Sequence, residues 1–288
     1  MRPYFKLSGG GNDFLALVEP EPIPQPELIQ AWCQRGLSLG ADGLFHLERS
    51  QHGARMRYYN ADGKPADLCL NGTRCAVRLA VHLGWADETI EIETGAGPIL
   101  GRIEGPAAVE LVLPVPGPPI ETDLVVGDRH LHGWIVDVGV PHFVIEWPAG
   151  LSKAPIAELG PPIRSHPDFG AGGTNVDFVL FCERHLFEIR SFERGVETET
   201  LACGTGVLAS AATGVHLGHL EPPIKARTLG GFLLKVGEAE DQNGSAGWTL
   251  TGDARILSHG NVTPEAEQLP RATQWSDPGV RKSDRAAS

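Results

Sequence analysis

The 288-residue sequence has no excess of basic residues, no long apolar run and no secretion signal. Its formal net charge of −12 argues against nucleic acid or an anionic membrane surface as a partner, because both attract basic patches. Its apolar runs fall short of the roughly 18 residues that a membrane-spanning helix needs. The first residues, 1–11, contain neither the apolar core nor the small-residue cleavage site of a signal peptide. We therefore expect a cytoplasmic protein.

The sequence also lacks the cysteine patterns of disulfide frameworks and metal centres. Its five cysteines are an odd number in a chain without a secretion signal, which argues against structural disulfides. No Cys-x-x-Cys pair is present, and no histidine lies between Cys69 and Cys75, so we expect no metal site. Cys33 and Cys75 are interpreted as apolar helix residues and Cys182 as a strand residue.

Motifs that bind nucleotides are missing as well. There is no P-loop, and Gly9-Gly10-Gly11 lacks the strand and the helix that flank a dinucleotide site. Many short strands, with one helical segment after each of two cysteines, favour the α+β class over a doubly wound parallel sheet.

What the sequence does contain is an internal repeat. The segments that follow Cys69 and Cys203 both reach Val-His-Leu-Gly after the same number of residues, at 81–84 and at 215–218. A duplicated fold that closes on itself brings equivalent positions together, so the repeat predicts two thiols that face each other across a cleft. A weaker echo relates two segments upstream of the cysteines, Gly11–Phe14 and Thr174–Phe178.

Each of these two cysteines lies directly before a predicted helix. Unpaired N–H groups and the positive end of the helix dipole favour a thiolate there, so we expect lowered pKa values for Cys69 and Cys203. The same N–H groups can hold a carboxylate and stabilise the negative charge that develops on it when a neighbouring carbon loses its proton. A racemase or epimerase that needs no cofactor can work with two such thiols. One, as thiolate, removes a proton from a carbon atom, and the other, as thiol, returns a proton to the opposite face.

Two other interpretations of the cysteine pair stay open. Both residues could be small apolar residues in helix-entry turns, although their agreement in register favours a function. Two facing thiols could also form a reversible disulfide, as in a redox switch.

The repeat divides the chain into two parts. We predict a first half over residues 1–115, completed by a returning strand near 254–262, and a second half over 116–253. The proline-rich segment 114–119 marks the boundary between them. Residues 263–288 are polar and are predicted to form a disordered tail.

Three motifs give the sequence a resemblance to a known family. They are Lys6–Phe14, with its three consecutive glycines, Asn60–Cys75 around the first cysteine, and Glu193–Gly206 around the second. From about Phe5 to Val262 the chain resembles the diaminopimelate epimerases. The resemblance implies two pseudo-symmetric halves, each a curved, mainly antiparallel sheet wrapped around a central helix, with the active site in the cleft between them.

The resemblance also implies what the protein does. It implies an isomerase that interconverts LL- and meso-diaminopimelate without a cofactor, in the synthesis of lysine and peptidoglycan precursors, and a homodimer. Cys69 and Cys203 would be the catalytic acid and base, and His142 and Glu193 would tune the pKa values of the two thiols. The residues implied in substrate binding are Asn12, Asn60, Leu70, Asn71, Asn175, Glu193, Arg194, Gly204 and Thr205.

The polar residues of this set also have simpler interpretations. The asparagines can be turn residues, His142 can be a satisfied core histidine, and Glu193-Arg194 can be a pair on the surface. The chemistry of the substrate favours a binding site over these simpler interpretations. The second zwitterionic centre of a diaminopimelate needs one group that binds its carboxylate and another that accepts hydrogen bonds from its ammonium. Arg194 and Glu193 provide these two groups.

The sequence departs from the family pattern at three places. Leu70 replaces the usual glycine after the first cysteine, Val140 replaces a common asparagine, and the loop from Gly195 to Ala202 is longer than usual. These departures leave open a racemase of another amino acid, such as histidine, with the same fold. A non-catalytic thiol switch or binding protein is the alternative from a different class.

Overall fold

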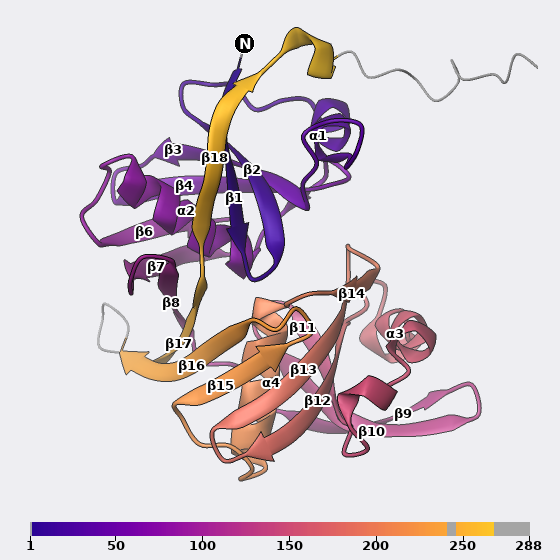
Figure 1. Ribbon diagram of the computed structural model, residues 1–288. Helices are drawn as coiled ribbons and strands as arrows, with labels where there is room; N and C mark the ends of the chain where they lie inside the picture. The colour runs from indigo at the N-terminus through magenta and orange to yellow at the C-terminus, as the bar shows by residue number, and fades with distance from the viewer. Residues whose placement is uncertain (1, 241–245, 268–288) are drawn as a thin grey trace, which may run out of the picture.

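The computed structural model describes residues 2–240 and 246–267. Its strands fall into two groups, which lie one above the other in Figure 1. The first group comprises β1 (Arg2–Gly9), β2 (Asn12–Val18), β3 (Gly43–Arg49), β4 (Gly53–Asn60), β5 (Pro65–Ala66), β6 (Thr89–Thr94), β7 (Gly97–Ile103), β8 (Ala108–Pro114) and β18 (Arg255–Val262). The second group comprises β9 (Ile120–Val126), β10 (Arg129–Asp137), β11 (Pro141–Glu146), β12 (Asn175–Glu183), β13 (Leu186–Glu193), β14 (Thr198–Thr200), β15 (Ile224–Thr228), β16 (Leu233–Glu240) and β17 (Ala246–Asp253).

The strands of each group pair in one continuous order. In the first group the order is β18, β1, β2, β3, β4, β6, β7, β8. In the second it is β9, β10, β11, β12, β13, β15, β16, β17. The pairs β2–β3, β4–β6, β11–β12 and β13–β15 are parallel, and the others in these two orders are antiparallel. Because β8 also pairs with β17, the two groups form one mixed sheet, which agrees with the predicted α+β class.

One helix packs against the strands of each group. α2 (Leu70–His82) contacts β1, β4, β6, β7, β8 and β18, and α4 (Gly204–His216) contacts β10, β11, β12, β13 and β16. Both helices are followed by a glycine in the left-handed region, Gly84 with φ +70° and Gly218 with φ +73°. Glycine has no Cβ to clash in this conformation, so both helices end where the Val-His-Leu-Gly repeat places them.

Two further helices, α1 (Pro26–Cys33) and α3 (Ile156–Arg164), are shorter. α1 begins with Pro26, in the first turn, where a proline fits a helix well. α3 was not predicted, because it contains Pro161-Pro162 and proline normally interrupts a helix. Its apolar face, which includes Ile163, is buried against β12 and β13, and this packing compensates for the missing backbone hydrogen bonds.

The apolar core has three parts. The main cluster contains residues of both strand groups together with the buried faces of α2 and α4. A second cluster lies under α3, and a third lies under α1 around Trp32, whose side chain is fully buried. Since the main cluster is shared, the two central helices are held in one packed body.

The chain crosses between the two strand groups twice. After β8 it enters the second group through β9, and after β17 it returns through β18, the long gold strand in Figure 1. β18 lies where a returning strand was predicted, near 254–262, while the domain boundaries themselves stay a prediction. A short 3-10 helix, η3 (Pro264–Glu267), follows and contacts α1. The rest of the predicted tail, 268–288, lies outside the described residues.

A chain that ends after Ala254 should be less stable by about 3–5 kcal/mol, because it loses the ladder between β18 and β1 and the burial of Val262. Urea unfolding followed by circular dichroism measures this difference. A chain that ends after Glu267 is the matched control, since it keeps every described contact of β18. Equal urea midpoints for the two truncated chains would contradict the structural role of β18.

Candidate active site

A cavity of about 920 Å³ is lined by residues of both strand groups. The first group contributes the turn after β1, the end of β4 and the segment that leads into α2. The second contributes the turn before β11, the end of β13 and the segment that leads into α4. The predicted site residues that line it are Asn12, Asn60, Cys69, Leu70, Asn71, Asn175, Glu193, Arg194, Cys203, Gly204 and Thr205. Of the predicted set, His142 alone is not part of this wall.

The two cysteines occupy the same position in their helices. Cys69 is the N-cap of α2, and its Sγ accepts a hydrogen bond from the Gly72 N–H at 3.4 Å. Cys203 is the N-cap of α4, and its Sγ accepts from the Gly206 N–H at 3.4 Å. The structure therefore brings both predicted thiols to one cavity, each at a helix N-terminus.

The first turn of each helix also offers free backbone donors. The first four N–H groups of a helix have no partner within the helix. In α2 and in α4, the N–H of the third helical residue bonds to the Sγ of the capping cysteine, and the N–H of the fourth makes the first helical bond, to the carbonyl of that cysteine. The first two remain for a ligand: those of Leu70 and Asn71 in α2, and those of Gly204 and Thr205 in α4.

The side chain of Asn71 is already engaged by the protein. Its Nδ2 donates to Asn12 Oδ1 at 2.7 Å and to the carbonyl of Ala202 at 3.0 Å, while its Oδ1 accepts from Arg74 at 2.6 Å. A carboxylate at this helix would therefore bind the backbone N–H of Asn71. The Nδ2 of Asn12 is also engaged, since it donates to Asp42 at 3.1 Å.

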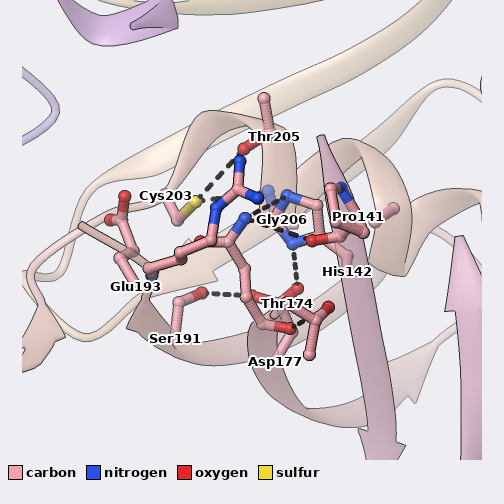
Figure 2. A network of polar contacts seen from close by, with 12 residues as sticks. Pro141, His142, Thr174, Asp177, Ser191, Glu193, Cys203, Thr205 and Gly206 are labelled. Atoms are coloured by element: carbon pink, nitrogen blue, oxygen red, sulfur yellow. Dashed lines mark hydrogen bonds and ion pairs between the residues drawn. The ribbon is translucent and has the colours of Figure 1, made fainter. Parts of the chain in front are cut away.

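Two acidic residues, Glu193 and Asp177, belong with Cys203 to the network of polar contacts in Figure 2. Burial raises the pKa of Cys203 well above its usual value, and the negative charges of Glu193 and Asp177 raise it further. A contact of 3.4 Å with the Thr205 hydroxyl acts in the opposite direction. Burial also raises the pKa of Glu193, while hydrogen bonds from Thr200 and Cys203 lower it.

The thiol of Cys69 lies in a different environment. Burial raises its pKa to about 11, and the charge of Glu193 adds to this effect. The Gly72 N–H, a hydrogen bond with the Tyr58 hydroxyl and the charge of Arg74 lower the pKa. The expectation of lowered thiol pKa values at the helix N-termini was therefore wrong for the free protein. Loss of hydration outweighs the helix N–H groups, and both cysteines are thiols at neutral pH.

His142 lies behind the cavity wall. Its Nδ1 donates to Asp177 at 2.6 Å, and both side chains are fully buried. Asp177 also accepts from the Ser191 hydroxyl at 2.5 Å, and the amide of Asn175 lies 3.4 Å from His142 Nε2. In the described part of the chain, no hydrogen bond joins His142 to either thiol. Its effect on Cys203 is therefore indirect, through its bond to Asp177 and through its charge, which lowers the pKa of Glu193. Asp177 was not singled out in the sequence because an isolated aspartate in an apolar strand carries no motif.

Arg194 also lines the cavity. Its backbone N–H donates to Asn175 Oδ1 at 2.9 Å, whereas its guanidinium has only a long contact of 3.5 Å with the carbonyl of Gly172. Val140 and Asn60 line the same cavity. The guanidinium can therefore reach a carboxylate without first breaking a strong bond to the protein.

Residues 4–111 and 134–257 match the sequence family described as diaminopimelate epimerase. The chain belongs to the diaminopimelate epimerase family. A family member from Aquifex aeolicus is 33% identical over 277 residues, which cover 91% of this chain and 98% of that protein. One from Methanothrix thermoacetophila is 38% identical over 252 residues, which cover 80% of this chain and 87% of that protein.

Solved structures with the same fold have more distant sequences. A proline racemase from Agrobacterium radiobacter K84 has a TM-score of 0.70 at 15% identity, over 93% of this chain and 96% of that one. A PhzC/PhzF phenazine biosynthesis protein from Clostridium difficile has a TM-score of 0.67 at 14% identity, over 91% of this chain and 100% of that one. At these identities the likeness shows the fold alone.

Leu70, the departure from the family pattern beside the first thiol, has a structural explanation. Its side chain is only 4% exposed and packs against Gly204, where an added Cβ would lie 3.1 Å from the Leu70 Cβ. The leucine thus fills the space between the N-termini of α2 and α4. Its backbone N–H keeps its place in the first turn, so the replacement of glycine leaves the donor in position.

The described residues contain no group of three or more histidine, cysteine, aspartate or glutamate side chains that could hold a metal ion. Within the same ranges, no helix is both long and apolar enough to cross a membrane.

Labelling of Cys69 by iodoacetamide should rise about tenfold per pH unit between about pH 7 and pH 10, because the thiolate is the reactive form and the pKa is about 11. Mass spectrometry of the labelled peptides measures the rate, with the exposed Cys182 as the control. A rate that levels off below about pH 8 would show that the helix N–H groups outweigh burial.

Glu193→Gln should accelerate the labelling of Cys203 by about tenfold at about pH 8. Removal of the negative charge lowers the thiol pKa and so increases the thiolate fraction at a pH below that pKa. Glu188→Gln, on the same strand but paired with Arg227, is the matched control. An unchanged or slower reaction of Cys203 in Glu193→Gln would mean that this carboxylate does not set the thiol pKa.

Proposed function

We propose that the protein is an isomerase that interconverts LL- and meso-diaminopimelate without a cofactor, on the route to lysine and peptidoglycan precursors. The observation that carries this proposal is the pair of thiols at the N-termini of α2 and α4, which line one cavity from the two strand groups. The names of the curated relatives, at identities above 30% over most of both chains, support the substrate.

The chemistry needs one base and one acid. The thiolate of one cysteine removes the proton from the α-carbon of the substrate, and the thiol of the other donates its proton to the opposite face. Proton number is conserved, and the reverse reaction exchanges the two roles. The charge that spreads onto the carboxylate is held by the free N–H groups of Leu70, Asn71, Gly204 and Thr205.

One thiol must lose its proton for this reaction to begin. In the free protein, burial raises the pKa of both cysteines. The bound amino acid brings an α-ammonium group into the cavity, and a positive charge near a thiol favours the thiolate. Substrate binding therefore prepares the base that the free protein lacks.

The far end of the cavity suits the second amino-acid centre of diaminopimelate. Arg194 binds its carboxylate, and the oxygen atoms of Asn60 and Glu193 accept hydrogen bonds from its ammonium group. Asn12 and Asn175 shape the wall between the two ends and hold Asn71 and Arg194 in place. Here Val140 offers no polar contact.

Two pseudo-symmetric halves account for the facing thiols. The two groups of strands have the same order and the same parallel pairs, and each surrounds one helix that begins after a cysteine. In this scheme β2 corresponds to β11 and β3 to β12. Asn175, which opens β12, then corresponds to Gly43 rather than to Asn12, so the echo between Gly11–Phe14 and Thr174–Phe178 is not part of the repeat. The halves at 1–115 and 116–253, the cytoplasmic location and the homodimer belong to the same proposal.

A racemase of another amino acid is the second candidate. It is favoured by Val140, which places an apolar side chain in the cavity where the family commonly has an asparagine. Such an enzyme would use the same thiols and the same N–H groups, and only the far end of the cavity would differ. A thiol switch without catalysis would not need Arg194 in the cavity.

Proton NMR in D2O with a reducing agent tests the reaction and the substrate together. The α-proton signal of LL-diaminopimelate should disappear as the enzyme exchanges it for deuterium, while histidine and glutamate in parallel samples keep theirs. Exchange of another amino acid instead would move the assignment to the second candidate. Absence of exchange in folded, reduced protein would overturn the two-thiol proposal.

Cys69→Ala and Cys203→Ala should each lower the rate of epimerisation by at least about 10²–10⁴-fold, because each removes one of the two proton-transfer groups. Cys182→Ala, which alters an exposed thiol outside the cavity, should keep the full rate. Epimerisation kinetics of the wild type and the three variants measure these rates, and circular dichroism verifies that each protein is folded. Normal turnover in either single variant would rule out a mechanism that uses both thiols.

A further inference from the structure

A buried arginine without a counter-ion lies beside the first cysteine. The side chain of Arg74, in α2, is 0% exposed. In residues 2–240 and 246–267 no carboxylate forms an ion pair with it. The charge of Asp253 favours the guanidinium from a distance, but the Asp253 carboxylate accepts from the Gly10 N–H at 2.8 Å and from Arg255 at 2.9 Å. An unpaired buried charge is costly, so a stable protein keeps one only where something else requires it.

The position of the guanidinium is tightly fixed. Its Nη2 donates to Asn71 Oδ1 at 2.6 Å, and its Nε donates to the carbonyl of Asp253 at 3.3 Å. Glycines leave room for it on two sides, because a Cβ at Gly10 would lie 3.1 Å from Nη2 and one at Gly252 would lie 2.9 Å from Nε. Its Nη1 is buried and has no hydrogen-bond partner in the described part of the chain.

Arg74 also decides which way the amide of Asn71 points. The guanidinium can only donate, so Asn71 must turn its oxygen toward Arg74 and its Nδ2 toward the cavity. Nδ2 then reaches Asn12 in the first strand group and the carbonyl of Ala202 in the second. Ala202 directly precedes Cys203. The two cysteine turns, which come from different strand groups, are thus linked through one oriented amide.

We propose that Arg74 is a positioning residue of the epimerase that also supplies a fixed positive charge beside Cys69. It orients Asn71, which ties the turn of Cys203 to the N-terminus of α2. Its charge offsets the negative charges that a Cys69 thiolate and a substrate carboxylate bring to that helix. The second part rests on the proposed function, because it requires a substrate carboxylate in the cavity.

The charged and titratable groups around Cys69 act in opposite directions on its thiolate. Glu193 faces the thiol from β13 and disfavours the thiolate, while Tyr58 on β4 and Arg74 on α2 favour it. Tyr58 offers a neutral hydroxyl, so among these side chains only Arg74 brings a positive charge.

Labelling of Cys69 in the free protein separates an electrostatic role from a merely structural one. At about pH 8, Arg74→Met should label at Cys69 about tenfold more slowly than the wild type, because the thiolate fraction falls when the positive charge is lost. Arg74→Lys, which keeps the charge, should remain within about threefold of the wild type. Cys203, with Glu193 and Asp177 as its charged neighbours, should change less. A purely structural role would loosen the site and leave the rates unchanged or raise them.

Arg78→Met is the matched control. Arg78 lies on the same helix, one turn after Arg74, and donates to the carbonyls of Gly105 and Ala108 outside the cavity. Its replacement should change neither the labelling of Cys69 nor the epimerisation rate. Should Arg74→Met fail to fold, Arg74→Gln carries the same comparison, since it keeps a donor for Asn71 without a charge.

Epimerisation kinetics supply the second readout. Arg74→Met should lower kcat by at least about tenfold with little change in KM, and Arg74→Lys should recover part of the loss. A folded Arg74→Met protein that labels Cys69 at the wild-type rate or faster would overturn the role of the charge. If the wild type does not epimerise diaminopimelate, the proposed function fails, and the labelling comparison still decides the role of Arg74.

Discussion

The N-termini of two helices must share one enclosed cavity, and the rest of the structure serves this constraint. Each N-terminus brings a thiol and two free N–H groups, and neither set can act on both faces of a carbon atom by itself. The sheet brings the two helix N-termini to one cavity, because each strand group surrounds one helix and the pairing of β8 with β17 joins the two groups. The two crossings of the chain, through β9 and β18, fix how the groups are joined.

Burial has two opposing effects at this site. It removes water from the thiols and raises their pKa values, which works against the formation of a base. It also strengthens every hydrogen bond and charge inside the cavity, so the same N–H groups hold a carboxylate more firmly than they would in water. The charged neighbours differ between the two thiols. The charges of Glu193 and Asp177 raise the pKa of Cys203, whereas Tyr58 and Arg74 lower the pKa of Cys69. The two halves of the site are therefore not electrostatically equal.

The sequence predicted the elements that carry local signals. Cys69 and Cys203 each precede a helical pattern that ends at a glycine, and both helices form where the repeat places them. It failed where packing overrides local preference. α3 forms in spite of Pro161-Pro162 because its apolar face is buried. In the proposed correspondence of the two halves, Asn175 matches Gly43, so the echo between the Asn12 and Asn175 segments falls outside the repeat. A few identical residues cannot reveal the order of strands, because the pairing of strands depends on contacts between segments that are distant in the sequence.

The sequence by itself determined the chemistry that is present: two thiols in equivalent turns before two helices, and the polar residues that suit an amino acid with two charged centres. Only the tertiary structure decided how those groups behave. It buried Cys203 and partly buried Cys69, and so reversed the expected direction of their pKa values. It placed His142 behind Asp177, engaged the side chain of Asn71 between two strand groups, and enclosed Arg74 without a partner carboxylate. Residue types and their spacing fix which groups can react, whereas hydration and charge depend on neighbours that are far away in the sequence.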